Sequence, residues 1–120
     1  AVIGAGFLVG KPLSILLMNA EATVTICNVH TKNLNEICRA SDIIISCAGK
    51  KDLVRGTMVK RGAVVIDIGY SFADGVYSGD VNVPEVSKVA SFVTPTPGGV
   101  GPITVAKLLS NVARAARLKF

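Results

Sequence analysis

The sequence has few of the residues that mark nucleic-acid-binding and membrane proteins. It has no tryptophan, and only 5% of its 120 residues are aromatic. The net charge is +5, but the basic residues are not interleaved with aromatic residues that could stack on bases. No apolar run reaches the roughly 18 residues of a membrane span, and no charged segment followed by an apolar one opens the chain. We therefore predict neither nucleic acid nor a membrane as a partner.

Histidine and cysteine are also scarce, which limits metal and disulfide chemistry. The chain has one histidine and three cysteines, Cys27, Cys38 and Cys47, with no C-x-x-C spacing. This odd set predicts neither a disulfide framework nor a zinc site. We expect each cysteine to act as a small hydrophobic core residue in its reduced form, which favours a cytoplasmic location.

Apolar residues make up 50% of the chain and charged residues only 18%, which indicates one globular domain over residues 1–120. Short apolar runs alternate with glycine-rich turns and amphipathic segments. They predict strands over residues 1–3, 23–27, 42–46, 63–67 and 91–93, a small hairpin over residues 70–81 around Asp74-Gly75, and helices beginning near Pro12, Thr31 and Ile103. This order predicts an α/β fold with a doubly wound, mostly parallel, Rossmann-like sheet.

Two of these helices carry specific packing predictions. We expect Thr31 to cap the second helix, whose buried face would hold Leu34, Ile37 and Cys38. The third helix, to about Leu118, is expected to bury a stripe of Val105, Leu108, Leu109, Val112 and Ala116. The chain opens on a strand shorter than the usual 5–6 residues, so we expect it to be a fragment of a longer protein.

The first strand leads into a glycine-rich turn, Gly4-Ala-Gly6-Phe-Leu-Val-Gly10. Gly4 would allow a tight turn, Gly6 would let a pyrophosphate approach the backbone, and Gly10 would let the helix pack closely on the strand. The N-terminus of that helix offers N–H groups and a positive dipole end. The G-x-G-x-x-x-G spacing is one residue longer than the usual fingerprint, and an ordinary strand-to-helix turn is the alternative. The order of strand, helix and strand around it favours a dinucleotide site.

The end of the second strand usually decides which dinucleotide binds. An acidic residue there bonds to the 2′-hydroxyl of NAD, whereas an arginine accommodates the 2′-phosphate of NADP. The run Cys27-Asn-Val-His-Thr31 holds neither. Asn28 offers a hydrogen bond without charge, and His30 and Lys32 could assist a phosphate only from the side. The choice between NAD and NADP stays open.

Three further segments follow predicted strands at the carboxyl edge, where open α/β sheets bind ligands. They are Ala48-Gly49, Asp67-Ile-Gly69-Tyr70 and Thr94-Pro-Thr-Pro-Gly-Gly-Val-Gly-Pro-Ile-Thr104. The last holds too much proline and glycine for regular structure and leads into the long helix, which is typical of a shaped, ligand-facing loop. No Ser-His-Asp, Cys-His or paired-carboxylate arrangement is recognisable, so we predict no catalytic residue and no metal site in this chain.

With these motifs the sequence resembles the nucleotide-binding domain of the bifunctional methylenetetrahydrofolate dehydrogenase/methenyltetrahydrofolate cyclohydrolase family, the FolD family. The matching runs extend nearly from end to end: Val2-Ile-Gly4 with Val9-Gly10 and Pro12, Ala22-Thr-Val-Thr25, Thr31-Lys-Asn-Leu34, Gly62-Ala-Val-Val-Ile-Asp-Ile-Gly69, Gly79-Asp-Val81, and Thr94-Pro through Thr104-Val-Ala106. The resemblance implies an NAD(P)-binding domain. The intact enzyme would oxidise 5,10-methylenetetrahydrofolate by hydride transfer and hydrolyse the 5,10-methenyl product to 10-formyltetrahydrofolate.

The resemblance also implies roles for individual residues. The cofactor-binding set is Gly4, Ala5, Gly6, Val9, Gly10, Val29, Thr31, Ala48, Gly49, Tyr70, Gly79, Asp80, Val81 and Thr104. Within it, Val29 and Thr31 match positions near the adenosine ribose, and Tyr70 stands where the family usually has Ile beside the nicotinamide. The residues implied to face the folate substrate are Pro97, Gly98, Gly99 and Val100. The family's catalytic Lys and Tyr lie in an N-terminal domain that this sequence does not contain, and folate binds through that domain.

The sequence departs from the family where NADP is recognised. Many members carry Arg-Ser at Ala5-Gly6 and Ser or Arg at Val29, and those side chains serve the 2′-phosphate. The resemblance therefore implies NADP, with NAD possible. It also implies a homodimer, and an exposed apolar patch where the other domain docks. A free-standing nucleotide-binding module and a different Rossmann-type dehydrogenase, such as a shikimate or amino-acid type, are the alternatives.

Overall fold

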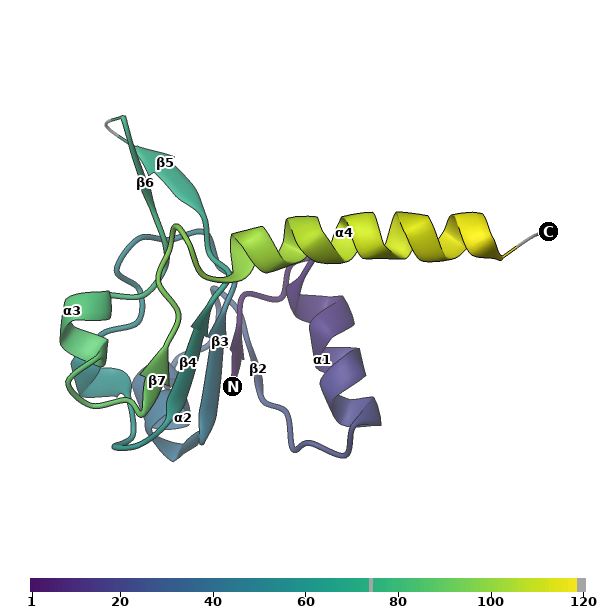
Figure 1. The fold of residues 1–120 in the computed structure, drawn as a ribbon. Helices are drawn as coiled ribbons and strands as arrows, with labels where there is room; N and C mark the ends of the chain where they lie inside the picture. The colour runs from purple at the N-terminus through teal and green to yellow at the C-terminus, as the bar shows by residue number, and fades with distance from the viewer. Residues whose placement is uncertain (74, 119–120) are drawn as a thin grey trace.

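Five short apolar segments form the central sheet of the computed structural model, which describes residues 1–73 and 75–118 (Figure 1). They are β1 (Val2–Ile3), β2 (Ile26–Cys27), β3 (Ile43–Ser46), β4 (Val64–Asp67) and β7 (Phe92–Val93). The strand order is β2-β1-β3-β4-β7, and every neighbouring pair is parallel. The predicted doubly wound parallel sheet is confirmed.

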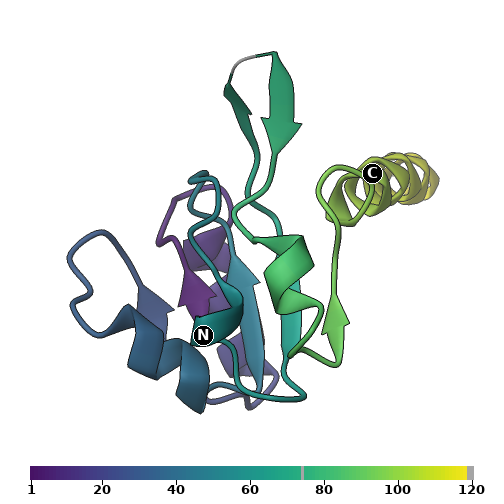
Figure 2. The same ribbon diagram turned by 90° about the vertical axis from the view of Figure 1, so that its left-hand side faces the viewer.

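The helices lie on both faces of this sheet (Figures 1 and 2). α1 (Gly10–Asn19) lies on one face, whereas α2 (Leu34–Ala40), the 3-10 helix η1 (Gly56–Met58) and α3 (Val83–Val86) lie on the other. The sequence pattern predicts neither α3 nor η1, because a single turn is too short to show a helical period.

The main core lies between the sheet and the layer of α2, η1 and α3. Ile3, Ile44 and Val65 of the three central strands belong to one buried cluster with Cys38 of α2 and Val86 of α3. Each of these side chains is at most 3% exposed. Cys38 is thus the small core hydrophobe that the sequence predicts.

The opposite face of the sheet is covered only in part. Because successive residues of a strand point to opposite faces, Ile26, Ile43 and Phe92 share this second face. They are 43%, 50% and 58% exposed. The second face therefore keeps an open apolar surface beside α1.

The last helix, α4 (Val100–Arg117), extends away from the sheet (Figures 1 and 2). None of its 18 residues, all of them described, is buried. The prediction of a buried stripe is therefore wrong: the stripe is amphipathic, but it finds no partner within the described chain. Its exposed fractions are 60% for Val105, 62% for Leu108, 66% for Leu109 and 59% for Val112, and Ala116 is exposed as well. Among the described residues, no helix has the length and apolarity needed to cross a membrane.

Two smaller elements differ from or refine the predictions. β2 is shorter than the predicted strand over residues 23–27, because β1 is its partner and β1 begins only at Val2. β5 (Ser71–Ala73) and β6 (Val76–Ser78) form the predicted antiparallel hairpin, which stands away from the sheet (Figure 2). The aspartate predicted for its turn, Asp74, lies outside the described residues.

Candidate dinucleotide-binding site

The carboxyl ends of all five strands meet at one edge of the sheet, because the strands are parallel. β1 pairs with β2 on one side and β3 on the other, so the strand order reverses next to β1. Such a switch point is where open α/β sheets leave a crevice for ligands. The turn after Ile3 and the loop after Ser46 flank this crevice.

The turn between β1 and α1 needs two of its three glycines for close backbone packing. Gly4 has a φ of 105°, and a Cβ there would lie 2.6 Å from the carbonyl oxygen of Cys47. A Cβ on Gly10 would overlap the carbonyl oxygen of Gly4. The roles predicted for these two glycines are borne out by this geometry: they allow a tight turn and the close approach of helix and strand.

The third glycine, Gly6, leaves open space instead. Apart from Gly6 itself and its two chain neighbours, no described residue has an atom within 4 Å of the position that a Cβ would take on Gly6. Within the described residues, no side chain caps α1 at its N-cap Val9, and its first turn has no acidic residue. In the first turn the N–H of Lys11 donates to the carbonyl oxygen of Gly6 at 3.0 Å and Pro12 has no N–H, so this helix N-terminus attracts an anion mainly through its positive dipole end. The turn, which includes Ala5, therefore fits a diphosphate.

The end of β2 closes a turn on itself. The amide oxygen of Asn28 accepts the N–H of His30 at 2.9 Å, and the hydroxyl oxygen of Thr31 accepts the N–H of Asn28 at 2.9 Å. The prediction that Thr31 caps the second helix is therefore wrong. α2 begins later, after Asn33. Val29 is 93% exposed at the tip of this turn. The oxygens of Asn28 and Thr31 are thus hydrogen-bonded within the turn. Residues 27–29 include no charged residue type, so the ribose end of the site has no charge at these positions.

The loop after β3 is held by a buried carboxylate. Asp80 is fully buried, and its Oδ2 accepts the hydroxyl of Ser46 at 2.7 Å and the N–H groups of Ala48 at 2.7 Å and Gly49 at 3.3 Å. Its Oδ1 accepts the N–H of Lys50 at 2.7 Å. Both oxygens of the Asp80 carboxylate, which is predicted to lie near the nicotinamide, thus accept hydrogen bonds from this chain. Contact of Asp80 with a cofactor stays a prediction.

A second buried carboxylate holds the segment that contains Asp80. Asp67, at the end of β4, accepts the N–H groups of Gly69 at 2.9 Å, Asp80 at 3.1 Å and Val81 at 3.0 Å. Burial raises the pKa of Asp67, and the bonds from the N–H groups of Asp80 and Val81 oppose this shift. Sequence reasoning identified Asp67 only as a strand-end carboxylate. The signal that would have revealed its role is the recurrence of glycine beside each aspartate, at Gly69 and Gly79.

The loop after β7 is tied to the same unit. The hydroxyl oxygen of Thr94 accepts the N–H of Asp67 at 2.7 Å. Further along, Gly98 has a φ of 98°, and a Cβ on Gly99 would overlap the carbonyl oxygen of Pro95. Pro97 belongs to this shaped loop and Val100 is the first residue of α4 directly after it, so the residues predicted to face the substrate lie at the same sheet edge as the crevice.

Two predicted cofactor residues lie on exposed elements. Tyr70 directly precedes β5, is 59% exposed and stacks on Tyr77 with ring centroids 4.8 Å apart. Thr104 lies in the first turns of α4, and its hydroxyl donates to the carbonyl oxygen of Val100 at 3.1 Å. Contact of either residue with a cofactor stays a prediction.

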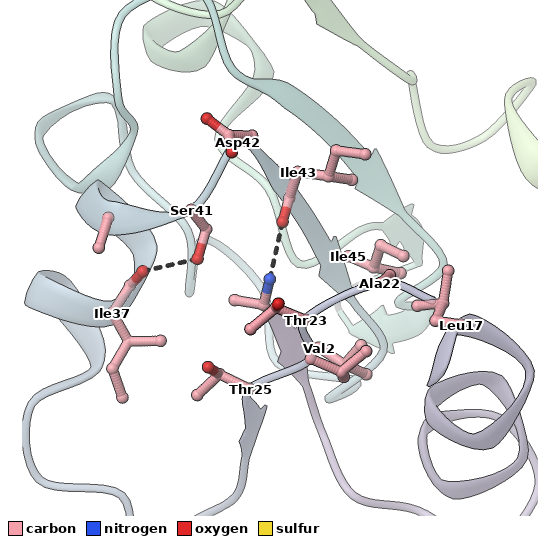
Figure 3. Close-up of a pocket in the computed structure, with 13 residues that line it drawn as sticks. Val2, Leu17, Ala22, Thr23, Thr25, Ile37, Ser41, Asp42, Ile43 and Ile45 are labelled. Carbon is pink, nitrogen blue, oxygen red and sulfur yellow. Dashed lines mark hydrogen bonds between the residues drawn. The ribbon is translucent and has the colours of Figure 1, made fainter. Parts of the chain in front are cut away.

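A hollow on the surface lies at the opposite edge of the sheet (Figure 3). It has a volume of about 580 Å³ and is lined at the amino ends of β1 and β3 by residues such as Val2, Leu17 and Ile43. There the backbone nitrogen of Ala1 donates to the carbonyl oxygen of Ile43 at 2.8 Å. Because ligands of open α/β sheets bind at the carboxyl edge, this hollow is not part of the dinucleotide site.

The switch point, the glycine turn and the uncapped helix define a dinucleotide-binding domain of the doubly wound α/β class. A family model described as the tetrahydrofolate dehydrogenase/cyclohydrolase NAD(P)-binding domain matches residues 1–120. The chain belongs to this family and is its NAD(P)-binding domain.

Individual relatives agree with this assignment. The bifunctional protein FolD of Hydrogenobaculum sp. is 52% identical over 114 residues, which is 95% of this chain and 41% of that protein. FolD of Aquifex aeolicus is 45% identical over 119 residues, or 99% of this chain and 41% of that protein. The chain thus spans about two fifths of the length of these curated relatives.

Solved structures show the same fold. The crystal structure of the Campylobacter jejuni FolD enzyme superposes with a TM-score of 0.93 at 46% identity, over 97% of this chain and 42% of that chain. The Trypanosoma brucei FolD, complexed with NADP cofactor and an inhibitor, superposes with a TM-score of 0.89 at 43% identity, over 97% of this chain and 43% of that chain.

Proposed function

We propose that this chain holds NAD(P) in an enzyme that oxidises 5,10-methylenetetrahydrofolate and hydrolyses the product. In the first reaction a hydride leaves the methylene carbon between two folate nitrogens, whose lone pairs stabilise the resulting cation. In the second, water adds to the 5,10-methenyl carbon and the bond from that carbon to N5 breaks, which gives 10-formyltetrahydrofolate and releases a proton. When bound, NAD(P) supplies the hydride acceptor. The contribution of this chain to hydride transfer is positioning.

One observation carries the proposal: the uncapped start of α1 and the open backbone at Gly6 lie at the switch point, with the Pro97-Gly98 loop at the same edge. The turn would hold the diphosphate, and the loop after β3 would lie along the nicotinamide half. The shaped loop after β7 would face the folate. The strand order decides which half of an extended dinucleotide each loop would contact. β2 lies on one side of β1 and would be near the adenosine half, whereas β3 and β4 lie on the other side and would be near the nicotinamide half.

The acid–base groups and the folate site are assigned to a further domain of the intact enzyme. Both carboxylates of the sheet edge, Asp67 and Asp80, are at most 1% exposed and are held by N–H groups of the chain, so neither is placed to exchange protons with a substrate. Apolar side chains of the α4 stripe and Ile43 of the second sheet face are exposed, which supports the expectation of an apolar patch. We assign this patch to contact with that further domain.

The site is proposed to discriminate only weakly between NAD and NADP. Selection of NAD normally uses a carboxylate on the 2′-hydroxyl, and selection of NADP uses an arginine on the 2′-phosphate. The β2 turn presents neither, since Asn28 and Thr31 bond within the turn and Val29 is apolar. His30 and Lys32 are exposed beside it and favour NADP slightly. We expect NADPH and NADH dissociation constants within about ten-fold of each other, that is, within about 1.4 kcal/mol.

A homodimer in the cytoplasm completes the proposal. The exposed hairpin residues Phe72, Val76 and Tyr77, 50–62% exposed, offer an apolar surface for a contact between two copies. All three cysteines are free, which suits a reducing compartment.

Titration of NADPH and NADH into the chain, followed by nicotinamide fluorescence, tests the site. Gly6→Val should fold like the parent chain, because a Cβ at this position has open space around it, yet should weaken binding more than ten-fold by filling the space of the diphosphate. Thr23→Val replaces a hydroxyl by a methyl group at an exposed position on the opposite edge and should leave binding unchanged. If Gly6→Val binds NADPH as tightly as the parent chain, the assignment of the diphosphate to this turn is wrong. Oxidation of methylenetetrahydrofolate by this chain alone would contradict the division of labour.

A further inference from the structure

The two buried aspartates of the sheet edge form one interlocked unit. A Cβ on Gly69, two residues after Asp67, would overlap the carboxylate of Asp80. A Cβ on Gly79, one residue before Asp80, would overlap the carboxylate of Asp67. Each carboxylate therefore occupies the space that a side chain on the other's neighbouring glycine would need. The Asp-Ile-Gly motif at residues 67–69 and the Gly-Asp-Val motif at residues 79–81 therefore pack together as one structural unit.

This unit fixes the orientation of the loop after β3. Three successive N–H groups, those of Ala48, Gly49 and Lys50, converge on the Asp80 carboxylate. Such a run of N–H groups is an anion-binding concavity, and here the anion site is filled by the chain's own side chain. The loop is thus not available to a ligand phosphate through these N–H groups.

The same bonds determine where the loop's acceptors point. In a planar trans peptide the carbonyl oxygen points opposite to the N–H group. The carbonyl of Cys47 accordingly faces away from Asp80 and lies against Gly4 of the phosphate turn. The carbonyls of Ala48 and Gly49 likewise face away from the buried carboxylate, at residues that are exposed on the sheet edge. They are acceptors for a ligand that brings hydrogen-bond donors.

We propose that Asp80 is a positioning residue of the dinucleotide site, which turns the carbonyl oxygens of Ala48 and Gly49 toward the donors of the nicotinamide half. Those donors are the hydroxyls of the nicotinamide-side ribose and the carboxamide NH₂. The proposal rests on the proposed function, because it requires a dinucleotide at the switch point. The adenosine half lies on the β2 side of β1, away from this loop. Loss of Asp80 should therefore weaken one half of the ligand only.

The test compares a whole dinucleotide with ADP, which has the adenosine diphosphate part of the ligand but not its 2′-phosphate. Asp80→Asn keeps the size of the side chain but presents an NH₂ group to at least one N–H donor of the loop. By isothermal titration calorimetry, we expect this variant to bind NADPH about ten-fold more weakly and ADP within two-fold of the parent chain. Asp42→Asn, an exposed carboxylate at the amino end of β3 that pairs with Lys60, is the matched control and should change neither constant. Equal losses for NADPH and ADP, or no loss for either, would overturn the positioning role.

A second variant guards against a folding defect in Asp80→Asn. Ser46→Ala removes one donor to the same carboxylate oxygen and leaves the three N–H bonds of the loop. It should keep the fold and weaken NADPH by two- to three-fold, again without effect on ADP. If Asp80→Asn does not fold and Ser46→Ala leaves the ratio of the two constants unchanged, the inference fails. Absence of NADPH binding by the parent chain would instead refute the proposed function itself.

Discussion

Gly10→Ala is the substitution whose cost the structure defines best. The added methyl group would overlap the carbonyl oxygen of Gly4 and lie 2.9 Å from the carbonyl carbon. Both atoms are backbone atoms, and β1 cannot move away because it is bonded on both sides: Gly4 donates to Cys27 at 2.9 Å, and Cys47 donates to Ile3 at 2.8 Å. The start of α1 must therefore shift.

Two opposing terms set the magnitude. Overpacking at such a contact costs about 3 kcal/mol. Replacing a helical glycine by alanine contributes about 1 kcal/mol of stability in the other direction. The net loss is about 2 kcal/mol, which for a domain of this size lowers Tm by about 8 °C. NADPH affinity should fall as well, because the shift moves the N-terminus of α1 relative to the turn.

Thermal and urea unfolding followed by circular dichroism measure this loss. Gly101→Ala is the matched control: it is the same change in a helix, at a glycine with no described atom within 4 Å of the added methyl group. It should leave stability unchanged or raise it by up to about 1 kcal/mol. If Gly10→Ala unfolds at the same temperature as Gly101→Ala or above it, the close approach of α1 to β1 is refuted.

Three further outcomes are expected. Because burial raises the pKa of Asp67, the folded state favours the protonated carboxyl group. The stability of the parent chain relative to Asp67→Asn should therefore be highest below the ordinary carboxyl pKa, fall as the pH rises through the raised pKa of Asp67, and level off above it. Urea midpoints measured across pH 3–7 test this. Burial raises the pKa of Cys38 to about 11, so iodoacetamide at pH 8 should modify this thiol at least ten-fold more slowly in the folded chain than in urea, and equal rates would contradict its burial. Leu109→Gln on α4 should change the free energy of unfolding by less than about 0.5 kcal/mol, whereas Ile44→Ala in the core should cost about 2–5 kcal/mol, and a large loss in Leu109→Gln would show that α4 packs on this chain.

The fold was predictable because local and global signals agree. The continuous apolar run at residues 42–46 indicates a strand within a parallel sheet, and β3 indeed has neighbours on both sides. The glycine turn after β1 was recognisable because its backbone demands are local. The same locality limited the other predictions: Thr31 precedes a helix in the sequence, but its hydroxyl bonds to Asn28 within the preceding turn.

What the sequence could not predict depends on contacts between distant segments. The stripe on α4 has the period of a buried face, yet periodicity shows only that a face is apolar, not that this chain covers it. The bond between Asp80 and Ala48 joins residues 32 positions apart, and no local pattern encodes that distance. The glycines beside Asp67 and Asp80 carried the information, but their steric role is visible only when both segments are in place.

The two halves of the site differ in how completely this chain builds them. The dinucleotide half is fixed from within: the phosphate turn packs on Cys47, the next loop is held by Asp80, and Asp80 is held by Asp67. The substrate half is joined to this unit at Thr94, beyond which the loop leads into the unpartnered helix α4. A ligand that needs only the first half should therefore find it preorganised in this chain, whereas the folate is proposed to bind through a further domain. Dinucleotide binding without folate binding is the behaviour that this asymmetry requires.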